Sequence, residues 1–345
     1  MRPLGRKKVA RSAAVWLGVA LSAVCAWLLV RGTRAGEVRA ALAEAQLFWL
    51  VPVTSLLLLA FVLRAERWRS LYAPGRRPPL RDVTRALYVG YLFNAILPLR
   101  AGEAARIVAL DRRGGAPIAE TTATVVVERL FDVLSLLLLL FLMLPWLPVL
   151  TWTAAASALA AVLVVALAAA VTALALSAER LAAAAVRGVA RLPGLTEDRV
   201  AAPAERVLRG LAGLRTVRTA LVAFGLTTLS WLVVGLGYWL LMRAFEIELS
   251  PLSGLLVVIA IGLAMILPSS PAALGVFEGA TVLALAAYGV DESAALSYAL
   301  VLHALSVVPF LLLAPAILPA YRGALRRAQR VPATASAAPD SPART

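Results

Sequence analysis

The tripeptide Ile-Leu-Pro occurs twice in this chain, at residues 96–98 and 266–268, and each copy interrupts an apolar stretch that otherwise predicts a membrane helix. A proline inside an apolar helix removes a backbone donor and ends the helix there. In lipid the freed carbonyl groups must find partners, so broken helices survive only where protein or a water-filled cavity surrounds them. A matched pair of interrupted segments in the two halves of a chain indicates a transporter's binding site.

The composition favours a membrane protein. Of the 345 residues, 61% are hydrophobic and 15% are charged, which is less charge than a soluble protein of this length carries. Several apolar runs exceed the roughly 20 residues that span a bilayer. The net charge of +15 comes from basic blocks between these runs. That pattern is typical of cytoplasmic loops beside anionic lipid head groups, so we do not expect a nucleic-acid partner.

The loop charges predict an all-α polytopic protein with six full spans and two re-entrant helical hairpins. The expected spans are residues 12–30, 47–64, 118–143, 149–176, 219–242 and 293–319. The hairpin at 83–110 has basic flanks and is expected to enter from the cytoplasm. The hairpin at 252–289 has acidic flanks and is expected to enter from outside. Together they predict an inverted-topology repeat in a bacterial cytoplasmic membrane, with both termini cytoplasmic.

This topology divides the chain into five parts. They are an N-terminal segment with an uncleaved first span and an outer loop (1–45), a first membrane half (46–176), a cytoplasmic amphipathic connector (177–217), a second membrane half (218–320) and a basic, disordered cytoplasmic tail (321–345). Two aromatic residues in the basic loop after the second span, Trp68 and Tyr72, are expected at the membrane interface, where such side chains concentrate.

The first cluster of polar residues surrounds the first helix break at Pro98. Its members are Asn94, Arg100, Glu103 and Arg106. Gly102 permits a tight turn or a close backbone approach, and Glu103 and Arg106 share a helix face. Arginine forks of this kind bind phosphate in a bidentate manner. The cluster therefore predicts an anion site, with ordinary surface charges of a cytoplasmic loop as the alternative.

The second cluster comprises Glu128, Arg129 and Asp132, inside an expected span. Each such residue at the centre of a bilayer costs about 2.5–3.5 kcal/mol on insertion scales, so these charges must pair or face water. Arg129 and Asp132 can pair with each other, and Glu128 then needs Arg100 or Arg106. The cluster either contributes to the site or links two helices as a structural ion pair.

The third cluster lies at the second break. It comprises Pro268, Ser269, Ser270, Pro271, Gly275 and Glu278. The two prolines push the residues before them out of helical conformation, and the serines can bond exposed backbone groups or a ligand. An extracellular turn is the alternative, although Glu278 begins an apolar arm. The single histidine, His303, lies in the last span and either relays protons, binds phosphate, or makes a structural hydrogen bond.

Several kinds of chemistry have no matching pattern in the sequence. The one cysteine, Cys25, excludes a disulfide within the chain and a thiolate metal site. There is no glycine-rich loop followed by Lys-Ser/Thr, no His/Cys set with metal-ligand spacing, and no Ser-His-Asp arrangement. We therefore expect no catalytic residues, no cofactor and no metal.

Four segments of the chain resemble a known family. They are RAERWRSLY, GYLFNAILPLRAGEAARIVAL, TATVVVERLFDVL and ILPSSPAALGVFEGATVLALAAYGV. Across about residues 45–320 the chain is similar to the flippase-like family named after the lysylphosphatidylglycerol synthase transmembrane region, found in multiple peptide resistance factors. The resemblance implies flipping of a lipid, and we expect no soluble lysyl-transferring domain in this chain. The resemblance includes the residues named above in the three clusters, except Ser269 and Ser270, together with Pro98 and Gly102. His303 departs from it, because the family more often has arginine there.

We therefore expect a lipid translocase that moves an anionic phospholipid or a polyprenyl-phosphate-linked lipid. The expected partners are that lipid and an enzyme of lipid synthesis. Two other functions stay open: a membrane-embedded transferase acting on a lipid-linked substrate, and a scaffold for envelope lipid synthesis that transports nothing.

Overall fold

The computed structural model of the protein describes residues 43–73, 75–97, 100–114, 116–147, 217–265 and 271–317. Every regular element in these segments is helical. The elements are η1 (Leu47–Trp49), α3 (Leu50–Ser70), α4 (Leu80–Ile96), α5 (Gly102–Asp111), α6 (Ile118–Met143), η2 (Leu144–Trp146), α9 (Val217–Ala244), α10 (Pro251–Ala264), η4 (Pro271–Ala273), α11 (Val276–Ala286) and α12 (Glu292–Ile317). The expected spans 12–30 and 149–176, the connector 177–217 except its last residue, and the tail 321–345 lie outside the described residues.

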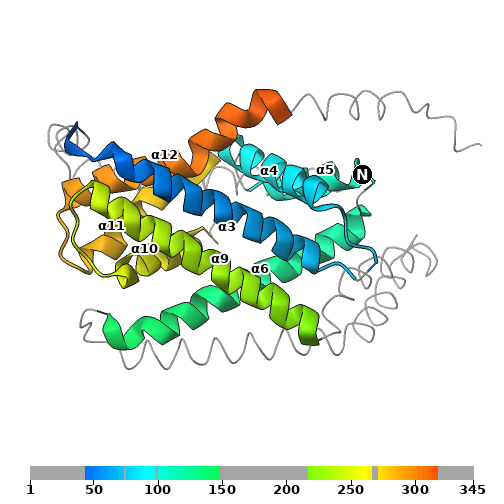
Figure 1. Cartoon of the computed structure of the whole chain (residues 1–345), viewed down its shortest axis with the longest axis horizontal. Helices are drawn as coiled ribbons and strands as arrows, with labels where there is room; N and C mark the ends of the chain where they lie inside the picture. Colours follow the sequence, from blue (N-terminus) through cyan, green and yellow to red (C-terminus); the bar gives the residue numbers. More distant parts are fainter. Residues whose placement is uncertain are drawn as a thin grey trace, which may run out of the picture.

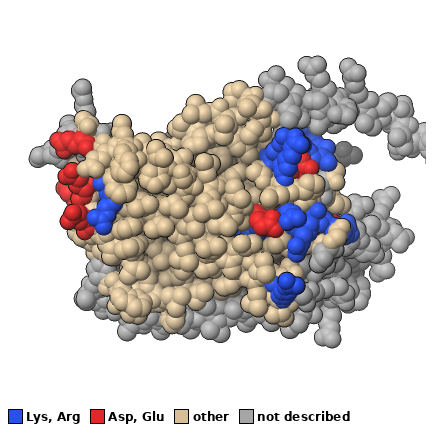
Figure 2. All heavy atoms as spheres, in the orientation of Figure 1, with Lys and Arg blue, Asp and Glu red and all other residues tan. Residues whose placement is uncertain are grey.

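Three described helices are long and apolar enough to cross a membrane. They are Leu47–Ser70, which includes α3, then α9 and α12. Their outer faces carry exposed leucines such as Leu59, Leu221 and Leu312. Figure 2 shows the charged residues of the visible face at two opposite ends, with a wide uncharged belt between them. So much exposed apolar surface requires lipid around it, and the protein is a membrane protein.

α6 differs from these three helices. It is 26 residues long, but its middle carries Glu128, Arg129 and Asp132. Most of its polar side chains face inward: Glu128 is 1% exposed and Asp132 is 7% exposed. α6 thus has charged residues in the middle of its interior face.

The short helices form two pairs at opposite ends of the long ones (Figure 1). α4 packs on α5, and α10 packs on α11 and on α9. The tips of the two pairs meet, because α4 contacts η4. Two apolar cores hold this arrangement together, one built mainly from α9 to α12 and the other mainly from α3 to α6.

The helix breaks fall at the two Ile-Leu-Pro copies, as predicted. α4 ends at Ile96, and Leu97 is already extended with φ −105° and ψ 145°. α10 ends at Ala264, immediately before the second copy. After the breaks, three non-glycine residues adopt left-handed backbone conformations: Arg100 and Ala272 with φ 54°, and Ala273 with φ 59°. Such conformations each cost about 1–3 kcal/mol and concentrate at functional sites.

Glycines allow the closest helix contacts. A Cβ atom on Gly102 would overlap the carbonyl oxygen of Gly90, so α4 and α5 touch through their backbones. In the other half, a Cβ atom on Gly254 would overlap the carbonyl oxygen of Gly235, which joins α10 to α9 in the same way. The close approach expected at Gly102 is confirmed.

The expected end of the second span, and the interface position of the aromatic residues after it, are wrong. α3 continues past residue 64 to Ser70, and Trp68 and Tyr72 are fully buried. Trp68 Nε1 donates to Thr124 Oγ1 at 3.1 Å, and the Tyr72 hydroxyl donates to Thr121 Oγ1 at 3.1 Å. The hydroxyl groups of α6 satisfy the polar ends of both rings, so these rings do not need water.

Candidate functional site

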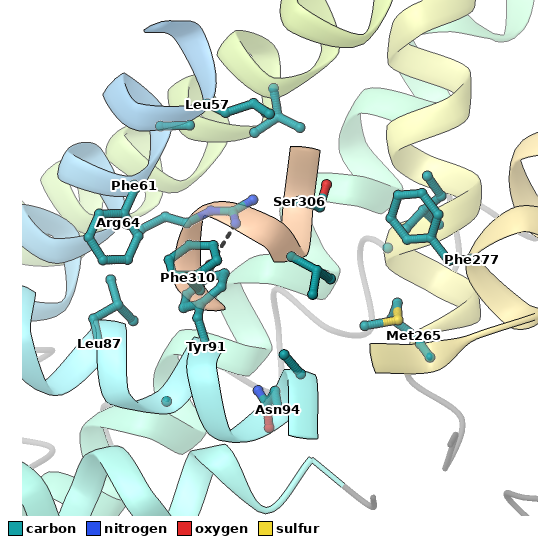
Figure 3. A pocket seen from close by; sticks show the side chains of 18 of the residues that line it. Leu57, Phe61, Arg64, Leu87, Tyr91, Asn94, Met265, Phe277, Ser306 and Phe310 are labelled. Carbon is teal, nitrogen blue, oxygen red and sulfur yellow. Dashed lines mark hydrogen bonds between the residues drawn. The ribbon is translucent and has the colours of Figure 1, made fainter. Parts of the chain in front are cut away.

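A cavity of about 490 Å³ lies where the two helix pairs meet. Residues of α3 and α4 line one side, and residues of α10, η4 and α11 line the other, as Figure 3 shows for Leu57, Tyr91, Met265 and Phe277. A volume of this size is within the range of small-molecule and cofactor sites. The residues with left-handed backbone conformations at the tips of the two pairs also line it. They are Arg100, Ala272 and Ala273.

A buried ion network forms the polar floor of this cavity. Arg67 of α3 reaches two carboxylates of α6: its Nη2 lies 2.6 Å from Glu128 Oε1 and its Nη1 lies 2.5 Å from Asp132 Oδ1. Arg67 is 2% exposed. A buried charge is tolerated only with such partners, so α3 and α6 are held together by this arginine.

Arg106 ties α5 into the same network. Its Nη1 lies 3.1 Å from both oxygens of Glu128, and its Nη2 lies 2.5 Å from Glu103 Oε2. Its guanidinium carbon also lies 4.7 Å from the centre of the Trp68 ring, a cation–π distance. Of the two partners predicted for Glu128, Arg100 and Arg106, the structure has Arg106. Glu103 and Arg106 share a helix face as expected.

Arg129 completes the network, with a half-exposed side chain. It lies 2.9 Å from Glu128, 3.3 Å from Asp132 and 3.4 Å from Glu103. The predicted pair of Arg129 and Asp132 is therefore present. With Arg129 included, three arginines face three carboxylates, and each carboxylate touches at least two arginines.

Two further arginines line the cavity without an ion pair among the described residues. Arg64 donates to the Tyr91 hydroxyl at 2.7 Å, drawn as the dashed line in Figure 3, and its guanidinium carbon lies 4.5 Å from the centre of the Trp231 ring. Arg100 donates to the backbone carbonyl of Met265 at 2.9 Å, which joins the two tips. Both guanidinium groups are thus held by uncharged partners rather than by a direct ion pair.

Unsatisfied donors accompany these arginines. Arg100 Nε and Trp231 Nε1 are buried, and each lacks a hydrogen-bond partner in the described part of the chain. Both residues line the cavity. Buried donors in folded proteins nearly always have an acceptor, so these two favour an acceptor-rich ligand.

The second helix pair contributes a buried acid, and α12 contributes a histidine. Glu278 Oε2 accepts the backbone N–H of Gly275 at 2.7 Å and so caps α11, while its Oε1 lies 2.6 Å from His303 Nδ1. The His303 ring stacks on Phe277 at 4.5 Å, and both residues line the cavity. The structural hydrogen bond anticipated for His303 is therefore present, at the cavity wall.

Asn94 makes the corresponding contact in the first pair. Its Oδ1 accepts the backbone N–H of Gly102 at 2.9 Å, which satisfies one of the free donors at the start of α5. The second helix of each pair, α5 or α11, thus begins at or directly after a glycine. In both pairs, a side chain of the same pair accepts a hydrogen bond from the N–H of that glycine.

The structure brings most of the predicted residues together. Those lining the cavity are Asn94, Arg100, Glu103, Arg106, Arg129, Asp132 and His303. Glu128 lies behind the arginines and Glu278 lies behind His303, so both support the wall. Pro98, Pro268, Ser269 and Ser270 lie outside the described residues, and Pro271 begins η4. Ligand contact by any of these residues stays a prediction.

Many cavity residues were not found from the sequence, and four of them carry the polar contacts or ring contacts described above. These four are Arg64, Arg67, Tyr91 and Trp231. Arg64 and Arg67 were assigned to a cytoplasmic loop, because the segment that follows residue 63 is dense in arginine. Their spacing of three was the available signal, since it places both on one face if the helix continues.

The other wall of the cavity is apolar. Leu57, Leu58 and Phe61 of α3 and Val258 and Ile261 of α10 contribute to it. Further apolar residues come from α12, including Val307, Pro309 and Phe310. The cavity is therefore amphipathic, with a charged floor and an aliphatic and aromatic wall.

Comparison with known proteins yields two matches. The family model described as "Lysylphosphatidylglycerol synthase TM region" matches residues 15–314. Glycosyltransferase AglD of Haloferax volcanii is 26% identical over 132 residues, which are 38% of this chain and 21% of that protein. The matched region thus represents about a fifth of the length of this curated relative.

Proposed function

We propose a lipid-translocating function, and we start from one premise: the chain belongs to the lysylphosphatidylglycerol synthase transmembrane-region family, whose model matches residues 15–314. The cargo is an anionic phospholipid or a polyprenyl-phosphate-linked lipid. The membrane crossed is the bacterial cytoplasmic membrane.

The amphipathic cavity is the observation that carries this proposal. Its arginines suit a phosphate group, because guanidinium forks bind phosphate oxygens in a bidentate manner. Its apolar wall, represented by Phe61, Ile261 and Phe310, suits the first part of a hydrocarbon chain. A soluble anion has no hydrocarbon chain to place against that wall, and a neutral lipid has no negative charge to pair with the arginines.

The arrangement of the helix pairs supports a transport mechanism. α4–α5 and α10–α11 lie at opposite ends of the long helices and meet at their tips (Figure 1). We interpret them as re-entrant hairpins of an inverted repeat, which in other transporters exposes one central site alternately to the two sides. The transport would be downhill or coupled to an ion, because the sequence has no nucleotide-binding loop.

Transport is tested by reconstitution into liposomes with fluorescent anionic lipids. The protein should speed the movement of an anionic lipid between leaflets relative to empty vesicles. Arg100→Ala should abolish most of this gain by removing a cavity arginine. Arg112→Gln is the matched control, because Arg112 is exposed just beyond α5. If no anionic lipid moves faster than in empty vesicles, or if Arg100→Ala transports normally, the proposal is wrong.

The proposed topology gives a second prediction. In a Cys25→Ser background, single cysteines at Arg112 and Asp291 should react with a membrane-impermeant maleimide from opposite sides of oriented vesicles. Both positions are exposed, one after α5 and the other before α12. Labelling of both from the same side would contradict the inverted repeat.

A membrane-embedded transferase is the second candidate, and the similarity to Glycosyltransferase AglD favours it. The same cavity would then hold a lipid-linked acceptor while a group is transferred to it. Incubation of the purified protein with a glycosyl donor and polyprenyl phosphate separates the two functions. A glycosylated lipid product would favour the transferase, and transport without product would favour the translocase.

A further inference from the structure

The charges of the cavity do not balance. Glu103, Glu128 and Asp132 are the carboxylates of the ion network, and each already contacts at least two of its arginines. The three network arginines match them in number, so the network is neutral. Arg64 and Arg100 add two positive charges. Glu278, a further buried carboxylate at the cavity wall, contacts His303 at 2.6 Å, and no described carboxylate forms an ion pair with Arg64 or Arg100.

We propose that the cavity selects a lipid whose head group is a phosphate monoester, with the doubly charged phosphate held between Arg64 and Arg100. The inference rests on the proposed function, since it specifies the class of lipid that the same cavity binds. The inference distinguishes two kinds of phosphate head group that a lipid site can bind. A phosphodiester, as in phosphatidylglycerol, carries one negative charge, and a terminal phosphate carries up to two near neutral pH.

The donors around the cavity fit a terminal phosphate. Such a group has three acceptor oxygens that are not blocked by a second ester. Arg64 approaches from α3 and Arg100 from the tip of the first hairpin, so they reach the cavity from different elements. The unsatisfied Arg100 Nε and Trp231 Nε1 supply two further donors. A diester brings one negative charge to these two arginines, and a positive charge without an ion-pair partner is unfavourable at membrane depth.

Arg64 and Arg100 make their direct contacts with uncharged groups. Arg64 is held by the Tyr91 hydroxyl and stacks on Trp231, and both partners are uncharged. Arg100 is held by the backbone carbonyl of Met265. Neutral partners fix the direction of each guanidinium and leave its charge for a ligand.

The test measures binding, which keeps it separate from transport. The purified full-length protein in detergent is titrated with dioleoyl phosphatidate, dioleoyl phosphatidylglycerol and dioleoyl phosphatidylcholine, which have the same chains and differ in the head group. Affinity is read by native mass spectrometry. Phosphatidate should bind about tenfold more tightly than phosphatidylglycerol, as expected for one additional charge-assisted contact.

Variants assign the preference to the two arginines. Arg64→Gln and Arg100→Gln should each reduce the preference for phosphatidate, and Arg112→Gln should keep it. Arg64→Lys serves as a second variant if Arg64→Gln does not fold, because it retains the charge. Arg64→Lys should keep a preference for phosphatidate that is smaller than that of the unmodified protein, because an ammonium cannot form the bidentate contact.

The outcomes distinguish this inference from the proposed function. Equal affinity for phosphatidate and phosphatidylglycerol, with both above phosphatidylcholine, would overturn the monoester assignment and leave an anionic-lipid site. Equal affinity for all three lipids would overturn both. A full preference for phosphatidate in folded Arg64→Gln and Arg100→Gln would overturn the assignment to these residues.

Discussion

Replacement of Glu128 by alanine should destabilise the protein by about 3–5 kcal/mol, the usual effect of removing one partner from a buried ion pair. Glu128 is 1% exposed and accepts contacts from Arg67, Arg106 and Arg129. Without it, three arginines face two carboxylates in a region with little water. We expect a lower melting temperature in detergent and a smaller yield of monodisperse protein.

Glu66→Ala is the matched control for this prediction. Glu66 also pairs with an arginine of α3, Arg69, at 2.7 Å, but both side chains are about one-third exposed. Ion pairs in contact with solvent contribute about 0–1 kcal/mol, so Glu66→Ala should change the melting temperature little. Equal melting temperatures for the two variants would show that the network does not stabilise the fold.

Gly102→Ala should have the second large effect. A Cβ atom there would overlap the carbonyl oxygen of Gly90 and come too close to the Asn94 side chain, so α5 must move away from α4. That movement would break the hydrogen bond from Gly102 N–H to Asn94 and displace Arg106 from the ion network. Overpacking of this kind costs about 1–3 kcal/mol, and occasionally more.

Gly225→Ala is the control for this second variant. Gly225 lies within α9, and a Cβ atom added to it would meet nothing within 4 Å. Alanine there should be neutral or stabilising by up to about 1 kcal/mol, because it favours the helix. Thermal melting of both variants measures the difference. A Gly102→Ala protein as stable as Gly225→Ala would contradict the proposed backbone contact.

The sequence predicted the helix breaks because a proline acts locally. The ends of α4 and α10 follow from the two Ile-Leu-Pro copies, whatever the helices pack against. The interior charges of α6 were also predictable, since charged residues in an apolar run must find partners. The sequence therefore places Asp132 and Glu128 in the site or in its support without identifying all of their partners.

The partners themselves depend on tertiary packing. Arg64 and Arg67 follow an apolar run within an arginine-rich segment, and a rule based on charge density assigns them to a loop. Trp68 illustrates the same limit, because its burial depends on a threonine hydroxyl of another helix, Thr124. Trp231 was not identified because nothing in an apolar span marks one aromatic residue as facing a cavity. Contacts between residues far apart in sequence leave no local pattern.

The two glycine contacts divide the molecule into mechanical units. Gly102 against Gly90 joins α4 to α5, and Gly254 against Gly235 joins α10 to α9, in both cases backbone to backbone. Backbone contacts of this kind leave little room for one helix to slide along the other. We therefore expect a change of shape to take place between these units rather than within them, for example where Arg100 meets the carbonyl of Met265.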